Sequence, residues 1–204
     1  YSAPMARFNT EKVMQEQVLS SFSLINPDSA PVERNKIYGF LTESYFNYPE
    51  TWRLIPKKIR SINRMQASLA QGEGLERLDG QMSVFVTSRF EKTSLQNEVR
   101  LFKDKLKIPD YKLGSFLERQ EMAYHEDMTF GVTEIYQMDP TISTQVDYEL
   151  WVSVMQSDDY YYIVSLLTPS RENEFYKWAR NIEAYKIVVG SMRRYDLNDA
   201  MYIQ

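Results

Sequence analysis

The only histidine of the chain, His125, lies in a short acidic stretch. The segment reads Tyr124-His125-Glu126-Asp127, and Glu121 precedes it. An imidazole beside carboxylates suggests a zinc site or a general base. A zinc site needs further ligands at suitable spacing, but the chain has no second histidine and no cysteine. No serine lies in the glycine-flanked turn of a nucleophile elbow either. We therefore interpret His125 as part of a solvated hairpin end and predict no catalytic residue and no metal ligand.

Other groups have suitable residue types for ligand binding but lack the required spacing. Asp158-Asp159 suits a turn, whereas a calcium loop needs acids at alternate positions followed by glycine. Gly72-Glu73-Gly74 has no following Lys-Ser or Lys-Thr pair, so it does not predict a phosphate loop. A basic cluster suits phosphate or an acidic partner, although a solvated face is the commoner explanation. Its members are Lys57, Lys58, Arg60 and Arg64.

Composition restricts the class of protein. The 204 residues include 28 acidic and 24 basic residues, which gives a net charge of −4 and a pI near 5.2. A nucleic-acid-binding protein normally has a basic face, so we predict no nucleic-acid partner. No apolar run reaches the roughly 18 residues of a membrane span. A chain with 43% hydrophobic residues is expected to form an ordinary globular core without a cofactor.

Aromatic residues concentrate in one short segment near the start of the predicted domain. Because side chains of a strand alternate between its faces, they cannot all point into the core. Two interpretations remain open: core packing, or a groove or sheet edge where a partner binds. We predict a partner-binding surface formed by Tyr45, Tyr48 and Trp52, with Lys57, Lys58 and Arg60 beside them. The whole aromatic set is Tyr38, Phe40, Tyr45, Phe46, Tyr48 and Trp52.

The elements that would position these residues follow from apolar periodicity. Helical spacing predicts a helix over 11–25, and capping-box residues from Thr93 predict another over 94–107. Residues 56–80 are irregular, and we expect a short helix and a loop there. The remaining expected elements are strands on both sides of Pro49-Glu50-Thr51, a strand over 81–90, a hairpin over 111–138, strands over 145–156 and 160–168, and a final helix over 175–192.

The last third of the chain decides the predicted fold class. Val146, Tyr148, Leu150, Val152 and Val154 alternate on one face, and the strand over 160–168 is apolar on both faces. The final helix has an apolar stripe of Phe175, Trp178, Ile182, Tyr185, Val189 and Met192. Runs of strands interrupted by single helices predict an α+β fold, an antiparallel sheet flanked by helices. We expect a leader and helix over 1–36, a single domain over 37–196 and a tail over 197–204.

This pattern resembles a known fold family. The segment Tyr45-Phe46-Asn47-Tyr48-Pro49-Glu50-Thr51-Trp52 is similar to the opening strand of proteins with the Mog1/PsbP-like fold, and the element order over 40–194 also matches. The resemblance implies an α/β/α sandwich and action by binding rather than catalysis. The segment 56–80 and the helix over 11–25 depart from the family pattern. The resemblance provides no catalytic residue to assign here.

The resemblance also sets the functional expectations. The family includes extrinsic photosystem subunits, small exported bacterial lipoproteins, a nuclear Ran-binding factor and secretion-system adaptors. We expect a non-enzymatic protein-binding or accessory protein of the bacterial cell envelope. The chain begins at Tyr1 rather than Met, which fits a removed signal peptide or lipoprotein leader and equally a truncated sequence. We expect an exported protein of the periplasm or cell envelope, with a lipid anchor upstream of the chain as one form. The alternatives are a carrier of a small molecule or lipid, and a cytoplasmic secretion adaptor or chaperone.

Overall fold

The computed structural model describes residues 33–40, 44–56, 61, 63–72, 79–141 and 146–194. All of these except Glu33 belong to a compact unit, Arg34–Gln204. The helix predicted over 11–25, the basic residues Lys57, Lys58 and Arg60, and the tail over 197–204 lie outside the described residues. Neither described α-helix combines the length and apolar character needed to cross a bilayer.

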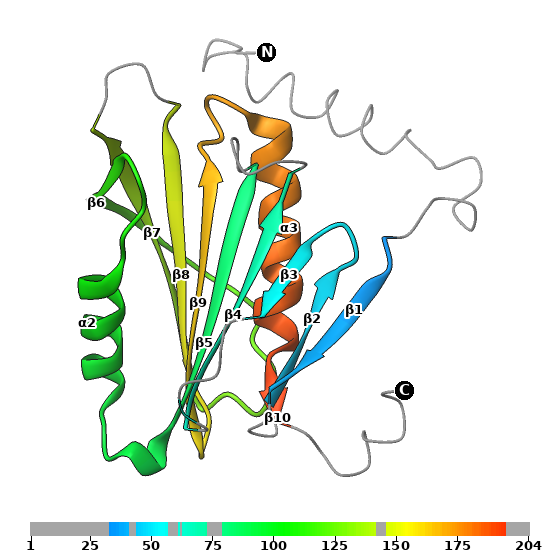
Figure 1. Ribbon diagram of the computed structural model, residues 1–204, viewed down its shortest axis with the longest axis vertical. Helices are drawn as coiled ribbons and strands as arrows, with labels where there is room; N and C mark the ends of the chain where they lie inside the picture. The colour runs from blue at the N-terminus through cyan, green and yellow to red at the C-terminus, as the bar shows by residue number, and fades with distance from the viewer. Residues whose placement is uncertain are drawn as a thin grey trace, which may run out of the picture. The chain divides into compact units, whose positions relative to one another are not determined.

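A large antiparallel sheet forms the centre of this unit (Figure 1). Seven of the described strands pair in the order β3-β4-β5-β9-β8-β7-β6. The central strand β9 is buried along almost its whole length, which confirms the expectation of a strand apolar on both faces. The strands are β3 (Arg53–Pro56), β4 (Arg64–Gln71), β5 (Gly80–Ser88), β6 (Tyr111–Gln120), β7 (Phe130–Pro140), β8 (Tyr148–Gln156) and β9 (Tyr160–Pro169).

One face of this sheet packs against the final helix α3 (Phe175–Ser191) and a second, smaller sheet. The smaller sheet has the order β1-β2-β10, with β1 at Asn35–Gly39, β2 at Ser44–Pro49 and β10 at Arg193–Arg194. Because strand side chains alternate, Met82, Val84 and Val86 of β5 all enter this core. The predicted helix stripe is confirmed at Ile182, Tyr185, Val189 and Met192, but Phe175 is 58% exposed.

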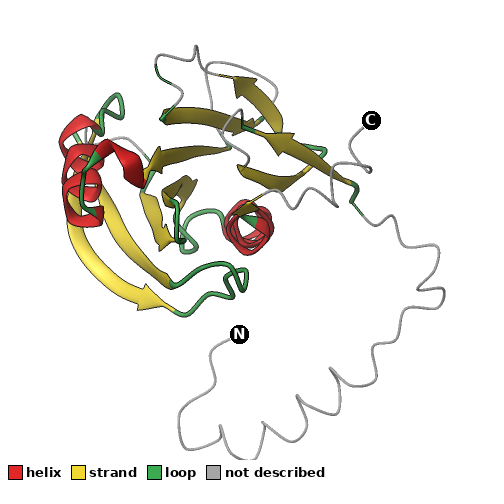
Figure 2. Cartoon of the chain, turned by 90° about the horizontal axis from the view of Figure 1, so that it is seen from below, coloured by secondary structure: helices red, strands yellow, loops and turns green. Residues whose placement is uncertain are grey.

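The other face packs against helix α2 (Leu95–Lys105), which Figure 2 shows on the side of the sheet away from α3. The helix begins after Ser94, whose Oγ accepts a hydrogen bond of 3.2 Å from the Asn97 amide. The helix predicted here is confirmed, but its cap is Ser94, one residue later than Thr93, which the capping-box pattern indicates. The core between α2 and the sheet contains Phe102, Leu150, Val152 and Val154, among others.

The segment predicted as irregular, 56–80, contains the strand β4, so its described residues 63–72 do not form the expected short helix. In β4, Met65, Ala67 and Leu69 are buried on the α3 face, and Arg64 and Gln66 lie on the other. The residues alternate with a period of two and form a strand, although some apolar positions also have helical spacing, because β4 pairs with β5 over its whole length. The short strand β1 was not predicted from the sequence.

The turn after Pro49 carries the chain from one sheet to the other. β2 pairs with β1 and β10, whereas β3 pairs with β4. The strands expected on both sides of Pro49-Glu50-Thr51 are therefore present, and they form a corner between the two sheets rather than a hairpin. The helices and antiparallel sheets confirm the α+β class.

Candidate functional site

The structure places the three predicted contact aromatics in the core. Tyr45 is 3% exposed, Tyr48 is 7% exposed and Trp52 is 2% exposed. These rings offer almost no surface to a partner, so the expectation that they form a docking surface is corrected in favour of core packing. The roles of Lys57, Lys58 and Arg60 stay predictions, because these residues lie outside the described part of the chain.

His125 connects the loop after β6 to the end of α3. Its Nε2 lies 3.4 Å from Arg193 Nη1, and its Nδ1 accepts a hydrogen bond of 3.3 Å from the Asp127 amide. The Arg193 guanidinium in turn lies over the Tyr45 ring, 4.8 Å from its centroid. Among the described residues, no group of three potential ligands could hold a metal ion. These contacts join the loop between β6 and β7 to β10 and β2.

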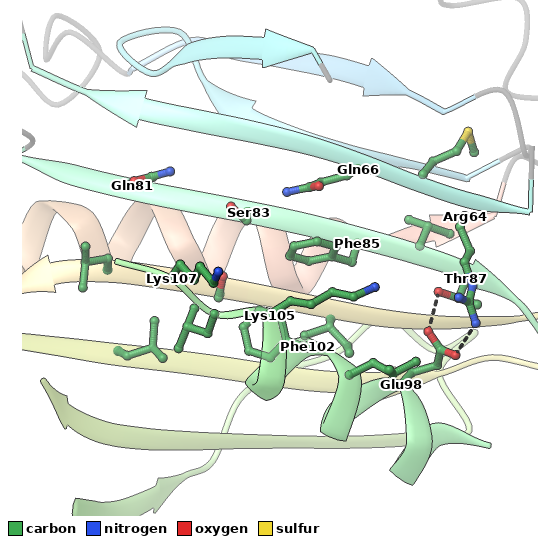
Figure 3. A pocket seen from close by; sticks show the side chains of 18 of the residues that line it. Arg64, Gln66, Gln81, Ser83, Phe85, Thr87, Glu98, Phe102, Lys105 and Lys107 are labelled. Atoms are coloured by element: carbon green, nitrogen blue, oxygen red, sulfur yellow. Dashed lines mark hydrogen bonds and ion pairs between the residues drawn. The ribbon is translucent and has the colours of Figure 1, made fainter. Parts of the chain in front are cut away.

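A cleft of about 750 Å³ lies beside helix α2. Strands β4, β5 and β9 form one wall, and α2 with the segment that follows it forms the other (Figure 3). We call this hollow the α2 cleft. Its polar and charged lining residues are Ser61, Arg64, Gln66, Gln81, Ser83, Thr87, Glu98, Lys105, Lys107 and Ser165.

The sheet wall of the α2 cleft owes its polarity to strand alternation. Ser68 of β4, Ser83 of β5 and Ser165 of β9 are aligned by the strand register, and the Oγ atoms of Ser68 and Ser83 are 3.4 Å apart. The opposite faces of these strands are apolar. Phe85 contributes an apolar part of the wall and packs edge-to-face on Phe102 of α2, with centroids 5.5 Å apart.

An ion pair between the exposed Arg64 side chain and the buried Glu98 carboxylate closes one end of the cleft. Arg64 Nη2 lies 2.7 Å from Glu98 Oε1, and Glu98 is 8% exposed. Thr93 Oγ1 donates to the same carboxylate at 2.7 Å and Thr87 Oγ1 donates at 3.3 Å. Burial of a carboxylate requires such partners, so this network fixes the first turn of α2 against β4 and β5.

The described residues of this lining include no histidine, and its carboxylate Glu98 is already held by three side chains. Sequence analysis missed Gln66, Gln81, Ser83 and Ser165. The signal was present in 64–70 and 81–87, where polar and apolar residues alternate, but alternation alone does not show which polar face is covered by a helix.

A second, shallower charged cluster lies where α2 approaches β6 and β7. Glu134 accepts a hydrogen bond from the Tyr136 hydroxyl, and Arg119 and Lys103 lie 3.3 and 3.8 Å from its carboxylate. The hydrogen bond from Tyr136 is the main cause that lowers the pKa of Glu134, with the two cations adding to it against partial burial.

This lowered pKa predicts a pH-dependent contribution to stability. Because the folded pKa of Glu134 lies below its unfolded value, the stabilisation is present above about pH 4.3 and disappears as pH falls through the folded pKa. We expect Glu134→Gln to be less stable than the unmodified protein at pH 7 and equally stable near pH 2. Urea unfolding at several pH values measures the difference. A gap that stays constant across this range would contradict the assignment.

Comparisons with known proteins agree on the fold. No protein-family model matches the chain, and no curated protein matches its sequence. The solution structure of cyanobacterial PsbP (CyanoP) from Synechocystis sp. PCC 6803 matches with a TM-score of 0.50 and 13% identity, covering 86% of this chain and 99% of that one. The crystal structure of the Saccharomyces cerevisiae Ran-binding protein Mog1p matches with a TM-score of 0.50 and 10% identity, covering 82% and 98%. An antiparallel sheet with a helix on each face, together with these two matches, shows that the chain has the Mog1/PsbP-like fold.

Proposed function

We propose that this protein is a non-enzymatic accessory protein that binds another protein, and that a segment of the partner lies in the α2 cleft. The observation that carries the proposal is the lining of the cleft. It combines an apolar wall with hydroxyl and amide groups and contains no described pair of residues arranged as nucleophile and base. Most binding pockets are built in this way, from apolar surface and a few polar groups that orient the ligand.

The polar groups favour a polypeptide over a lipid as the occupant. The side-chain amides of Gln66 and Gln81 make no hydrogen bond to any described residue, and each offers both donors and an acceptor. A peptide backbone can pair with such amides. An acyl chain cannot, so it would leave them buried without partners, which costs free energy. A carrier of a small molecule or lipid is therefore the second candidate function, after a protein-binding role.

The structural neighbours support a protein partner. Mog1p is described as a Ran-binding protein, so a fold of this kind serves protein binding in at least one case. At 10% identity that likeness extends to the fold, and the partner of this chain need not resemble Ran.

Photo-cross-linking in the native host tests the proposal. Benzoylphenylalanine is introduced at Gln66 or at Ser83, both in the α2 cleft, and at Glu183 on the exposed side of α3 as the matched control. We expect the two cleft positions to form covalent adducts with the same partner protein. The control position should form no adduct with that protein. Equal labelling at all three positions, or no protein adduct from the cleft, would contradict the proposal.

We also propose that the protein belongs to the bacterial cell envelope, in the periplasm or on a lipid anchor. The support is the resemblance to a family that includes small exported bacterial lipoproteins. Cell fractionation with an antibody against the chain measures this, and recovery with the cytoplasmic marker would favour the secretion-adaptor alternative.

A further inference from the structure

The charges around the α2 cleft differ from those of the chain as a whole. The described lining contains three cations, Arg64, Lys105 and Lys107, and one carboxylate, Glu98. Arg64 and Glu98 neutralise each other at 2.7 Å. Lys105 and Lys107 have no carboxylate within 4 Å among the described residues. A chain with a net charge of −4 thus presents two uncompensated positive charges at this hollow.

The end of α2 explains part of this arrangement. A cation in the last helical turn interacts favourably with the helix dipole, which accounts for the presence of Lys105. It does not account for Lys107, which lies beyond the helix C-cap Leu106. Both side chains line the cleft from the α2 wall, opposite the sheet wall that holds Gln66 and Gln81 (Figure 3).

Two amide side chains on the sheet wall, Gln66 and Gln81, are separated by a distance that an extended peptide could span. In the strand register Gln66 is opposite Phe85, and Gln81 lies four residues before Phe85 on β5. Four residues of a strand span roughly 13 Å, so the two amides are separated along the strands by about the length of four extended peptide residues. Between them lies the row of Ser68, Ser83 and Ser165.

We propose that the α2 cleft recognises an extended acidic peptide segment of the partner. Gln66 and Gln81 pair with its backbone amides, Phe85 and Phe102 contact an apolar side chain, and Lys105 and Lys107 receive its carboxylates. This inference rests on the proposed function and adds the chemical class of the bound segment. Charge complementarity is its main support, because the exposed ammonium groups of Lys105 and Lys107 attract carboxylates and repel basic side chains.

Selection from a phage library of random dodecapeptides, carried out on the full chain, tests the chemistry. We expect the enriched peptides to carry a net negative charge and to compete with one another. Lys105→Glu combined with Lys107→Glu should weaken their binding by about tenfold or more at low salt, and the loss should shrink in 1 M salt. Lys112→Glu combined with Arg171→Glu gives the same net charge at exposed positions outside the cleft and should leave binding unchanged.

The double variant Lys105→Gln and Lys107→Gln is a control for loss of binding through misfolding. It removes the two charges without placing acidic side chains at the C-terminal end of the helix. It should weaken binding in the same direction. Enrichment of neutral or basic peptides, no enrichment, or equal binding by the charge-reversed variant would overturn the inference. Binding of phosphatidylglycerol vesicles without binding of peptides would overturn it in favour of an anionic lipid. Cleft-specific cross-links that persist in the charge-reversed variant would reject the acidic segment and leave the proposed function standing.

Discussion

Replacing Trp52 by alanine is expected to lower the free energy of unfolding by about 3–5 kcal/mol, the range for a large buried aromatic side chain. The indole is 2% exposed and lies in the core between α3 and the sheets. It also packs on Gly80, where an added Cβ would lie 2.9 Å from the edge of the ring. The surrounding strands cannot collapse into the space that the indole leaves, because their own pairing holds them.

Urea unfolding followed by circular dichroism measures this change. Tyr176→Ala is the matched control, since it removes an aromatic side chain that is 88% exposed and should change stability by less than about 0.5 kcal/mol. The same experiment separates the two interpretations of the aromatic segment. A docking role for Trp52 predicts a stable variant that has lost its partner, and such a result would contradict the core assignment.

Replacing Tyr185 by phenylalanine is expected to cost about 1–3 kcal/mol, although it removes a single oxygen. Tyr185 is fully buried, and its hydroxyl oxygen lies 2.7 Å from Ser153 Oγ and 3.0 Å from the Val164 carbonyl oxygen, which can only accept a hydrogen bond. Ser153 continues to Thr133 at 2.6 Å, and Thr133 to the Tyr124 hydroxyl at 2.9 Å. This chain of hydroxyls fixes α3 to the buried faces of β7, β8 and β9. Phenylalanine would leave the Val164 carbonyl without this buried donor.

A double-mutant cycle with Ser153→Ala measures the coupling between the two hydroxyls, and we expect at least 0.5 kcal/mol because they are in direct contact. Tyr176→Phe at the exposed position is the control. Additive effects of the two buried substitutions would show that the chain of hydroxyls does not act as a unit.

The pH dependence gives a second readout of the same residue. Burial raises the pKa of Tyr185 far above its usual value near 10, so the folded protein keeps the hydroxyl protonated. Above about pH 10 the unfolded chain loses this proton and the folded chain does not, which favours unfolding. The unmodified protein should therefore lose stability more steeply than Tyr185→Phe in this range.

Much of the fold could be predicted from the sequence because it depends on local periodicity. The alternation in β8, the strand β9 that is apolar on both faces, and the stripe of α3 each follow from which residues must avoid water. The capping serine before α2 is likewise a local signal. The charge and the absence of cysteine are properties of composition, and they do not depend on the fold.

Other features depended on tertiary structure. The residues of β4 also have apolar positions at helical spacing, so their pattern fits a helix or a strand. Pairing with β5 makes them a strand. Tyr45 and Tyr48 lie on β2 and Trp52 lies on the turn after it, so the sequence left open that they face a partner. The tertiary structure buries all three rings. The α2 cleft exists only because α2 covers part of a polar sheet face. Local periodicity thus predicted most of the elements and their buried faces, but not β1 or β4. The tertiary structure decided which polar faces stayed open, because that depends on contacts between residues far apart in the chain.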